Sequence, residues 1–433
     1  MRKVILQQGE IEVTEKLAIN GGDRAIPEGT VKNWPPIDDT DREMVMASLE
    51  GDSHAFGPNC KAFQEEFAEW NGNEYSITTN SGTAALHMCV AACGGGAGDE
   101  IIVPAYSWSS SATCVLHHNC IPVFVDIDFD TINIDVDKIE DAITPRTKAI
   151  LVVHLHGLAV DMEKVMEVAR KHDLKVIEDA CQAHGATFQG KKVGTWGDCA
   201  AFSFNQNKCL CAGEGGMFVT DDEDMLNTAK QVWCFGETRT PLEDRDYHVY
   251  ALGWMYRNDD LGAAFGRSQL KKLDGYLEQQ KENAARFTEC LEEVPRLILP
   301  TEIEGAEHNW YNYTIRFQLD DLAESDEIPA LRDRIVSAMK AEGVDTGLWQ
   351  RFILPAMTVF QAKNGYGGGC PWNCPQAKEV DYSVDQYPAA QKHCDMHTGL
   401  TTPLRPPNGP EVAELTAEGI RKVMENLDQL PEN

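Results

Sequence analysis

The chain has 433 residues, 42% of them hydrophobic, which is enough for two or three domains or lobes with substantial cores. Its 38 basic and 69 acidic residues give a net charge of −31, which opposes phosphate backbones and argues against nucleic-acid binding. No segment approaches the roughly 18 apolar residues of a membrane span, and the first residues lack the apolar core of a signal peptide, so we expect a cytoplasmic protein whose 14 cysteines are reduced and mostly buried.

The chain begins with a predicted extension, residues 1–16, and a turn-rich stretch follows it. Helical spacing with an acid-rich start predicts a helix from Asp39 to Leu49. A strand is predicted over Tyr75 to Thr79, and the small residues after it open a helix at Gly82 and Thr83. Free N–H groups at such a helix start suit a phosphate, although this turn alone is weak evidence for one.

Strands and helices then alternate along the chain. Apolar runs at Glu100–Pro104, Ile121–Asp126 and Ala149–Val153 predict strands, and Asp137–Ile143 is predicted to be helical. This alternation indicates a largely parallel sheet covered on both faces. His154 and His156 follow the third strand; they could reach a site there, but hydrogen-bonded structural histidines are the simpler interpretation.

Two further apolar runs carry candidate chemistry at their ends. Leu174–Ile177 leads into Glu178 and Asp179, at the carboxyl end of a predicted strand, where open α/β sheets bind ligands. The run Ala200–Phe204 carries Ser203 and is followed by Lys208, a glycine-rich turn and a further strand. The sequence therefore offers an acid and a lysine at two strand ends.

That pair meets the needs of pyridoxal phosphate. A lysine amine can hold its aldehyde as a Schiff base, and a carboxylate facing the pyridine nitrogen keeps the ring protonated. Lys208 and Asp179 can fill these roles, and Ser203 could donate to the phosphate. Taken singly, Asp179 could instead cap a helix, Lys208 could be solvated and the glycines could be ordinary turns.

The order and spacing of these residues resemble a known family. The stretch from Val176 to Gly185, then Phe202–Phe204, Lys208 and Gly213–Gly216, resembles the sugar aminotransferases of the DegT/DnrJ/EryC1/StrS family. The similarity extends from about Leu17 to the C-terminus. It implies the type I fold of pyridoxal-phosphate-dependent transferases, an α/β fold with a mixed, mostly parallel seven-stranded sheet and a smaller C-terminal α/β domain.

The resemblance also implies a division of the chain. We expect an N-terminal extension and arm over 1–45, a large cofactor-binding domain over 46–275 and a small domain over 276–433. A long helix predicted from Leu270 to Leu291 lies at the boundary. In the small domain, a strand is predicted over Tyr313–Phe317.

By resemblance, several residues receive cofactor contacts. Gly82 and Thr83 would cup the phosphate, and Gln182 would lie near the phenolic oxygen. Trp108 would stack on the pyridine ring, although a core tryptophan is the open alternative. In the family, an asparagine reaches the cofactor phosphate of the neighbouring subunit, and Asp259 aligns with that asparagine. Because a carboxylate would repel the phosphate, Asn258 is the candidate for this contact. Such a contact implies a homodimer with a shared active site.

The implied reaction is transamination from glutamine or glutamate to a keto sugar or keto cyclitol. Trp34, His184 and a Pro-Trp loop favour the branch that makes aminocyclitols or 3-amino-5-hydroxybenzoate over nucleotide-sugar aminotransferases. A dehydratase is an alternative, but such relatives typically replace the lysine with histidine, and Lys208 is present. A noncatalytic regulatory relative would be expected to lose cofactor residues, and none of Asp179, Gln182, Ser203 and Lys208 is lost.

Two motifs remain outside this interpretation. Gly185–Lys191 has the spacing of a phosphate-binding P-loop, but Lys192 replaces the residue that would hold magnesium, so an NTPase is rejected. Residues 364–375 form a glycine-rich loop, predicted to be a mobile lid that lines the substrate site. Two cysteines of this loop and two later histidines have zinc-ligand spacing, but we interpret the thiols as incidental and predict no metal. These residues are Cys370, Cys374, His393 and His397.

Overall fold

The computed structural model describes residues 15–238 and 247–431, so residues 1–14 of the predicted extension lie outside the described residues. Seven strands form the central sheet, in the order β1-β9-β8-β5-β4-β2-β3. Only the two pairs that involve β9 are antiparallel, which confirms the mixed, mostly parallel sheet. The strands are β1 (Tyr75–Thr79), β2 (Glu100–Pro104), β3 (Ile121–Val125), β4 (Thr147–Val153), β5 (Lys175–Asp179), β8 (Cys199–Ser203) and β9 (Gly216–Thr220).

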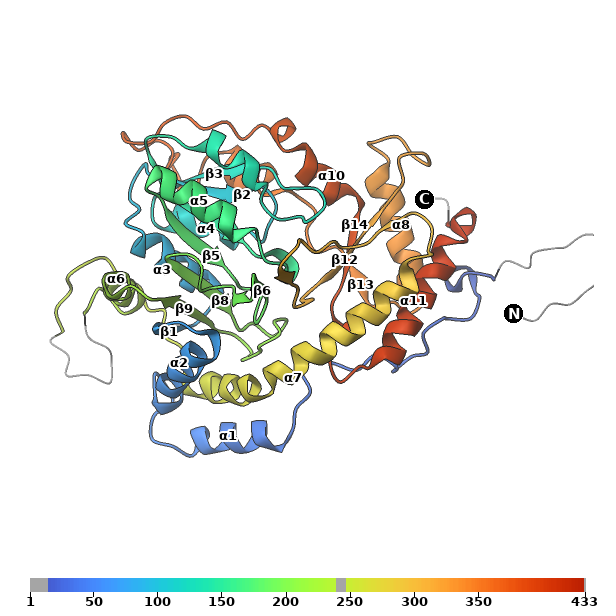
Figure 1. The fold of residues 1–433 in the computed structure, drawn as a ribbon, viewed down its shortest axis with the longest axis horizontal. Coiled ribbons are helices and arrows are strands. Elements are labelled where there is room, and N and C mark those ends of the chain that lie inside the picture. The colour runs from blue at the N-terminus through green and yellow to red at the C-terminus, as the bar shows by residue number, and fades with distance from the viewer. Residues whose placement is uncertain (1–14, 239–246, 432–433) are drawn as a thin grey trace, which may run out of the picture.

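Both faces of this sheet are covered. Successive side chains of a strand point to opposite faces, and every residue of β2, β8 and β9 is buried. Helices therefore pack on both sides, as expected for strands that read as continuous apolar runs (Figure 1). The helices of this part are α2 (Pro58–Asn71), α3 (Gly82–Ala92), α4 (Ser110–His117), α5 (Met162–His172) and α6 (Glu223–Trp233).

A second, smaller part of the chain has its own sheet and core. Its four strands are antiparallel, in the order β10-β12-β14-β13, and the predicted strand over Tyr313–Phe317 is β12. Buried apolar residues of α8 and α11 pack on this sheet as a separate core. The remaining elements of this part are β10 (Leu297–Ile298), β13 (Thr346–Gly347), β14 (His397–Leu400), α8 (Ile328–Ala341), α10 (Pro388–Met396) and α11 (Pro410–Met424). The short helix α9 (Thr358–Gln361) packs on the larger core, where the Phe360 ring lies 5.1 Å from that of Phe124 on β3.

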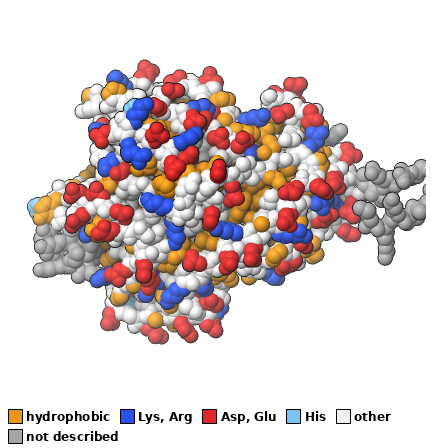
Figure 2. Space-filling view, viewed as in Figure 1, with side chains coloured by type: hydrophobic (Ala, Val, Ile, Leu, Met, Phe, Trp, Pro, Cys, Tyr) orange, Lys and Arg blue, Asp and Glu red, His pale blue; other side chains and the backbone are white. Residues whose placement is uncertain are grey.

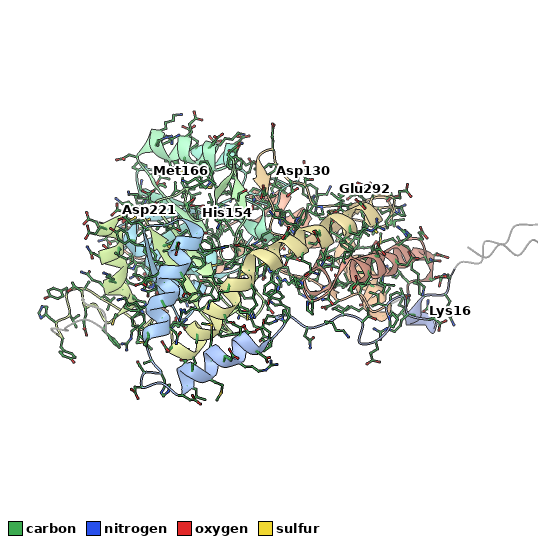
Figure 3. The ribbon with its side chains drawn as sticks, turned by 60° about the horizontal axis from the view of Figure 1, so that its bottom comes forward. Lys16, Asp130, His154, Met166, Asp221 and Glu292 are labelled. Atoms are coloured by element: carbon green, nitrogen blue, oxygen red, sulfur yellow. The ribbon has the colours of Figure 1, made fainter. Side chains whose placement is uncertain are left out.

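One long helix, α7 (Asp260–Leu291), connects the two parts. It packs against α1 (Asp39–Leu49) and α2 near its start and against α11 farther along. Figure 3 shows it running from the part that contains His154 to the part that contains Glu292. The expected start of this helix at Leu270 is wrong, because the Asp259 side chain caps an earlier start by accepting a hydrogen bond from the Gly262 N–H. The expected division of the chain at residue 275 falls within this unbroken helix, and it stays a prediction.

The helix predicted over Asp137–Ile143 does not form. Two short 3-10 turns, Val136–Lys138 and Glu140–Ala142, stand in its place. Ile143 is already extended, with ψ 132°, and Pro145 disfavours a helical conformation for Thr144 before it. A segment this short cannot offset the cost of starting an α-helix unless packing supports it.

The N-terminal arm is held against the smaller part by buried polar contacts. The Glu342 carboxylate accepts hydrogen bonds from the N–H groups of Ala18 (2.7 Å) and Ala25 (3.0 Å) and pairs with Lys422 at 3.0 Å. Farther along, the Asn408 side chain accepts from the Lys32 N–H and donates to the Lys32 carbonyl. The arm is therefore fixed at two points.

The surface carries the negative charge without concentrating it on the visible face. Figure 2 shows acidic and basic side chains interspersed over both parts of the molecule.

No helix of the described residues is long and apolar enough to cross a membrane. A small sheet of β6 (Thr187–Phe188), β7 (Lys191–Lys192) and β11 (Ala306–Glu307) joins the two parts.

Candidate active site

A cavity of about 690 Å³ lies at the carboxyl ends of β1, β5 and β8. The parallel strands bring their C-terminal residues to one edge of the sheet, where a topological switch leaves room for a ligand. Of the candidate site residues, all except Asn258 line this cavity. They are Gly82, Thr83, Trp108, Asp179, Gln182, Ser203 and Lys208.

Lys208 projects from the loop that follows β8. Its Nζ lies 3.4 Å from the Tyr311 hydroxyl and 4.6 Å from the centre of the Tyr311 ring. Burial lowers the pKa of Lys208, but nearby Tyr311, Cys181 and Asp179 oppose this effect and leave the pKa raised overall. The Lys208 carbonyl accepts a 3.0 Å hydrogen bond from the Trp34 indole, so the N-terminal arm reaches the backbone of this lysine.

Asp179 ends β5 and is 5% exposed. One carboxylate oxygen accepts a 2.7 Å hydrogen bond from the Ser111 hydroxyl, and the other accepts from the Cys181 N–H at 3.2 Å. Ser107 lies 2.7 Å from Ser111 and continues this chain of hydrogen bonds. Ser111 was not among the predicted site residues, although the serine-rich segment after β2 was a signal for a hydroxyl near this strand end.

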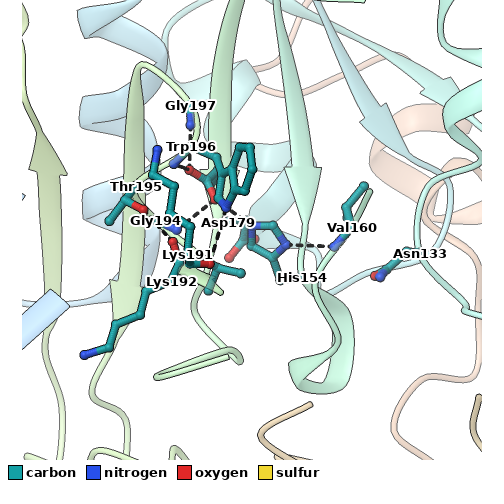
Figure 4. A network of polar contacts seen from close by, with 12 residues as sticks. Asn133, His154, Val160, Asp179, Lys191, Lys192, Gly194, Thr195, Trp196 and Gly197 are labelled. Atoms are coloured by element: carbon teal, nitrogen blue, oxygen red, sulfur yellow. Dashed lines mark hydrogen bonds and ion pairs between the residues drawn. The ribbon is translucent and has the colours of Figure 1, made fainter. Parts of the chain in front are cut away.

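Glu178, the acid beside Asp179, has a structural role. Its carboxylate accepts hydrogen bonds of 2.7 to 2.8 Å from three backbone N–H groups, those of Gly194, Trp196 and Gly197, and one of 2.9 Å from His154 Nε2. Figure 4 shows His154 between this network and Val160. Because the Val160 N–H donates to His154 Nδ1, the ring proton is on Nε2. His154 is therefore a hydrogen-bonded structural histidine.

The start of α3 offers a cradle for an anion. Ser81 caps the helix by accepting from the Ala84 N–H, and the Ala85 N–H donates to the Ser81 carbonyl. Within the described part of the chain, this leaves the N–H groups of Gly82 and Thr83 for a ligand. A Cβ atom at Gly82 would lie 2.8 Å from the Ser203 Cβ, so only glycine lets the helix start approach Ser203 this closely. Pyridoxal phosphate fits these residues: a phosphate at the cradle, a carboxylate for the ring nitrogen and a lysine for the aldehyde.

Two predicted ring contacts lie on the cavity wall. Trp108 is 53% exposed, which excludes the core-tryptophan interpretation, and its ring centre lies 6.3 Å from that of Trp349. The Gln182 side chain accepts a 2.9 Å hydrogen bond from the His156 N–H. Trp349 and Tyr311 come from the smaller part of the chain. Tyr311 lies in the segment His308–Tyr313, which by resemblance to the family was expected to approach the substrate, whereas Trp349 was not predicted.

Asn258 and Asp259 have different environments. Asp259 is the N-cap of α7, which accounts for a carboxylate at this position. Asn258 is buried, its Oδ1 accepts from the Asp259 N–H at 3.0 Å, and its Nδ2 has no partner among the described residues. This amide lies 3.3 Å from where a Cβ atom at Gly215 would be, so Asn258 is near the turn before β9. Its phosphate contact stays a prediction.

The cysteines and histidines with zinc-ligand spacing lie in two separate places. His393 and His397 are buried and stacked, with ring centres 4.6 Å apart, and the Tyr106 hydroxyl lies 3.2 Å from His397. Cys370 lines another cavity, beside His117. Over residues 15–238 and 247–431, no group of three or more potential ligands is placed to hold a metal.

The glycine-rich loop is not part of the wall of the main cavity. No residue between 364 and 375 lines that cavity, so the expectation that this loop lines the substrate site is wrong. The Tyr366 hydroxyl donates to the Leu116 carbonyl, and the Trp372 indole donates to the Tyr382 hydroxyl. The first bond ties the loop to α4, and the second ties it to Tyr382, whose hydroxyl donates to the Pro122 carbonyl of the edge strand β3.

Comparison with known proteins agrees with this geometry. A strand-end lysine and carboxylate facing one cavity of a mostly parallel sheet are typical of the type I class of pyridoxal-phosphate enzymes. Residues 35–389 match the model of the DegT/DnrJ/EryC1/StrS aminotransferase family, and the chain belongs to that family. The predicted enzyme class and cofactor are thereby confirmed at the level of the family.

Similar proteins include enzymes of several amino-sugar and aminocyclitol pathways. GDP-perosamine synthase of Caulobacter vibrioides is 37% identical over 72% of this chain and 82% of its own. A putative L-glutamine:3-amino-2,3-dideoxy-scyllo-inosose aminotransferase of Streptoalloteichus tenebrarius is 34% identical over 77% of this chain and 80% of its own. The crystal structure of 3-amino-5-hydroxybenzoic acid synthase superposes with a TM-score of 0.80 and 27% identity, covering 91% of this chain and 98% of the other.

Proposed function

We propose that this protein transfers an amino group from glutamine or glutamate to a ketone on a sugar or cyclitol ring. The observation that carries this proposal is the convergence of Lys208, Asp179 and the Gly82 cradle on one cavity. Bound pyridoxal phosphate supplies an electron sink for the pair of electrons left when the donor Cα loses its proton. The residues of this chain bind that group, orient it and move the proton.

Lys208 is assigned two tasks in this proposal. Its amine would hold the cofactor through the aldehyde in the resting enzyme, and the free amine would carry the proton away from the donor Cα once the donor is bound. Tyr311 lies within 3.4 Å of Nζ and orients the amine in the cavity. Asp179 would hold the pyridine nitrogen of the bound cofactor in its protonated form, and Ser111 fixes that carboxylate by donating a hydrogen bond to it.

The remaining contacts are assigned in the same way. Gly82, Thr83 and Ser203 would hold the phosphate, Trp108 would cover one face of the ring and Gln182 would contact the phenolic oxygen. Their positions on the cavity wall support these assignments. Asn258 is assigned to the phosphate of the neighbouring subunit, and its unpartnered amide supports an external acceptor for that group.

The acceptor is proposed to be a keto cyclitol or a related ring rather than a nucleotide sugar. The similarity to a scyllo-inosose aminotransferase and to 3-amino-5-hydroxybenzoic acid synthase supports this branch. The similarity to GDP-perosamine synthase supports the nucleotide-sugar alternative. The name of the scyllo-inosose relative, which specifies L-glutamine, supports glutamine as the donor.

We also propose that the active unit is a homodimer located in the cytoplasm. An apolar patch formed by Phe235, Val249, Leu252 and Met255 is 41 to 74% exposed, and a second copy would cover it. The patch is close in sequence to Asn258, so an interface there would bring that amide near the partner. All 14 cysteines are free thiols, which supports a reducing compartment.

The proposal is tested by the absorbance spectrum of the protein loaded with pyridoxal phosphate. We expect a band of the lysine-bound cofactor that glutamine or glutamate discharges, because the donor half-reaction leaves the amine form of the cofactor. A band that no amino acid discharges would favour the dehydratase alternative. A protein that gives no band would contradict the enzyme assignment altogether.

A further inference from the structure

Both peptide groups of Lys208 are held by side chains from outside its own loop. The carbonyl that precedes Lys208, that of Asn207, accepts a 2.7 Å hydrogen bond from the Arg405 guanidinium. The carbonyl of Lys208 itself accepts a 3.0 Å hydrogen bond from the Trp34 indole N–H. Arg405 follows β14, and Trp34 belongs to the N-terminal arm. The backbone position of the lysine therefore depends on two distant side chains.

The amine end of Lys208 is held through the same arginine. Its Nζ lies 3.4 Å from the Tyr311 hydroxyl, and the Tyr311 carbonyl accepts a 2.9 Å hydrogen bond from the second terminal nitrogen of Arg405. A guanidinium is planar and presents its N–H groups in a fixed fork. Arg405 therefore sets the spacing between the segment that carries the lysine and the segment that carries Tyr311.

Aromatic rings accompany these hydrogen bonds. The Arg405 Cζ lies 5.4 Å from the centre of the Trp34 ring and 5.1 Å from that of Tyr311. The Lys208 Nζ lies 4.6 Å from the centre of the same Tyr311 ring, so rings and cations alternate from Trp34 to Lys208. Cation–π contacts strengthen where water is excluded. They help to offset the burial of the Arg405 charge, which is 2% exposed and forms no ion pair with the described residues.

Arg405 extends from an anchored turn. The buried Asn283 side chain of α7 donates to the carbonyls of Leu404 (3.0 Å) and Asn408 (2.8 Å), which lie on either side of Arg405 in the sequence. The Asn408 N–H in turn donates to the Arg405 carbonyl at 3.0 Å. The Asn408 side chain also binds the backbone of Lys32 in the arm. The guanidinium is therefore presented from a fixed backbone.

Arg405 and Trp34 are placed behind the lysine and not in front of it. Neither residue lines the main cavity, so neither is placed to touch a bound cofactor or donor. Both hydrogen bonds of the Arg405 side chain go to backbone carbonyls, and its Nε is buried. These features belong to a residue that acts through Lys208 and Tyr311. A misplacement of about 1 Å at a reacting group can reduce a rate by about 100-fold, so such an indirect role can matter for the reaction.

We propose that Arg405 is a positioning residue for Lys208, and that Trp34 of the N-terminal arm shares this task. Arg405 fixes the lysine backbone through Asn207 and the lysine amine through Tyr311. The inference rests on the role of Lys208 in the proposed function, and it makes the N-terminal arm a working part of the site. Removing either side chain slows the steps that use the Lys208 amine and leaves the noncovalent binding of the cofactor nearly unchanged.

The test separates attachment of the cofactor from its binding. Stopped-flow absorbance follows the attachment of saturating pyridoxal phosphate to the Arg405→Gln apoprotein, and we expect the first-order rate to fall by about 10- to 100-fold. Glutamine carries its amide on a flexible side chain, so it does not fix both segments as a rigid guanidinium does. Calorimetry measures the binding of pyridoxine phosphate, whose alcohol group does not attach to a lysine. Its affinity should stay within about twofold, because the α3 cradle is unchanged.

Arg332→Gln is the matched control. Arg332 is 4% exposed and likewise donates to two backbone carbonyls, those of Cys394 (2.8 Å) and Asp395 (2.9 Å), but it is not bonded to the lysine segment. This variant should attach the cofactor at the wild-type rate. Trp34→Phe keeps a ring beside Arg405 and removes the indole N–H, and it should slow attachment several-fold. It decides the question if Arg405→Gln does not fold.

Three results would overturn the inference. The variants of Arg405 and Trp34 that fold could attach the cofactor as fast as the wild type. Arg332→Gln could be slowed as much as Arg405→Gln, which would make the effect a general consequence of losing a buried arginine. The affinity for pyridoxine phosphate could fall as much as the attachment rate, which would make Arg405 a determinant of cofactor binding.

Glutamine is then added to the attached wild type on the same instrument. A wild-type protein that attaches the cofactor but is not discharged by any amino donor loses the proposed reaction. The attachment rates need no donor, so the comparison of variants still decides the role of Arg405. A protein that glutamine discharges, and whose variants attach normally, keeps the proposed function and loses only the positioning role.

Discussion

The Ser111 hydroxyl lies 2.7 Å from the Asp179 carboxylate and 2.7 Å from the Ser107 hydroxyl. A hydroxyl has one proton, so Ser111 donates to Asp179 and Ser107 must donate to Ser111. Two serines from the segment after β2 therefore position the carboxylate at the end of β5. They are four positions apart in the sequence, and Ser111 is the one side chain of the described residues that donates a hydrogen bond to Asp179.

The first prediction concerns this support. Ser111→Ala should weaken pyridoxal phosphate binding by about tenfold, because Asp179 loses a charge-assisted hydrogen bond and its orientation toward the ring nitrogen. The dissociation constant is measured from cofactor fluorescence. Ser109→Ala, two residues earlier and without a contact to Asp179, serves as the control. Equal affinity in wild type and Ser111→Ala would show that the serine chain has no positioning role.

The assignment of the cofactor lysine gives a second prediction. Lys208→Ala should abolish cofactor attachment that borohydride reduction makes permanent, because no other lysine of residues 15–238 and 247–431 lines the main cavity. Mass spectrometry of the reduced protein locates the modified residue. The exposed Lys171→Ala variant should be labelled as the wild type is. If another residue were still labelled in the Lys208→Ala variant, the assignment of Lys208 as the cofactor-binding lysine would be wrong.

Removing the Glu178 carboxylate should destabilise the fold. Glu178→Gln replaces an acceptor of three backbone N–H groups and of His154 with an amide, and we expect a loss of about 2–4 kcal/mol at pH 7. Glu163→Gln on the exposed face of α5 should change stability little. Urea unfolding measures both, and a loss below about 0.5 kcal/mol in Glu178→Gln would contradict the network of Figure 4.

The same variant should also alter the pH dependence of stability. Burial raises the pKa of Glu178, but His154 and the N–H groups of Gly197 and Gly194 lower it further, so it lies below the ordinary 4.5. The ionised form is then favoured in the folded state, and its contribution is present above pH 4.5 and lost as the pH falls through the folded-state pKa. The stability difference between wild type and Glu178→Gln should therefore shrink in acid.

His184 should make the protein acid-sensitive. Burial, and then the charge of Lys208, lower the pKa of His184 from 6.5 to about 3. The unfolded chain takes up a proton near pH 6.5 and the folded chain does not, so folding loses about 1.4 kcal/mol per pH unit below 6.5 through this residue. His184→Phe should reduce that slope between pH 6 and pH 4.5, whereas the exposed His54→Gln should not. An unchanged slope in His184→Phe would show that the imidazole is protonated in the folded protein.

The dimer proposal makes a prediction about mass. Leu252→Glu places a charge at a side chain that is 74% exposed in the apolar patch, and it should shift the protein toward the monomer. Leu322→Glu, at a side chain 46% exposed in the smaller part, is the matched control. Analytical ultracentrifugation distinguishes the two states. A wild-type protein that sediments as a monomer would contradict the proposal directly.

Sequence reasoning worked best where local pattern and sheet geometry coincide. The bounds of β1 and β2 were predicted correctly because each is a short run rich in β-branched or aromatic residues that ends at turn residues. Asp179, Ser203 and Lys208 were found because they follow parallel strands, whose ends meet at one edge of the sheet. The sequence alone therefore located the wall of the cavity that the strand ends of the large sheet form.

The other side depends on packing between distant segments. Tyr311, Trp349 and Arg405 lie more than 100 residues after Lys208. Only Tyr311 falls in a segment whose resemblance to the family predicted an approach to the substrate, and no local pattern marks Trp349 or Arg405 as a neighbour of a cavity. The start of α7 was missed because Asp259 was weighed only as a phosphate contact and not as a helix cap. The positions of Tyr311, Trp349 and Arg405 beside the cavity follow from how the smaller part of the chain packs against the larger one.

The unbroken α7 has a mechanical consequence for turnover. It packs on both parts of the chain over 32 residues, so a hinge between them would have to bend a continuous helix. A continuous helix resists sharp bending unless a proline or an inserted side chain interrupts its hydrogen bonds, and α7 contains no proline. We therefore expect substrate entry and release to move the loops around the cavity while the two parts keep their relative orientation.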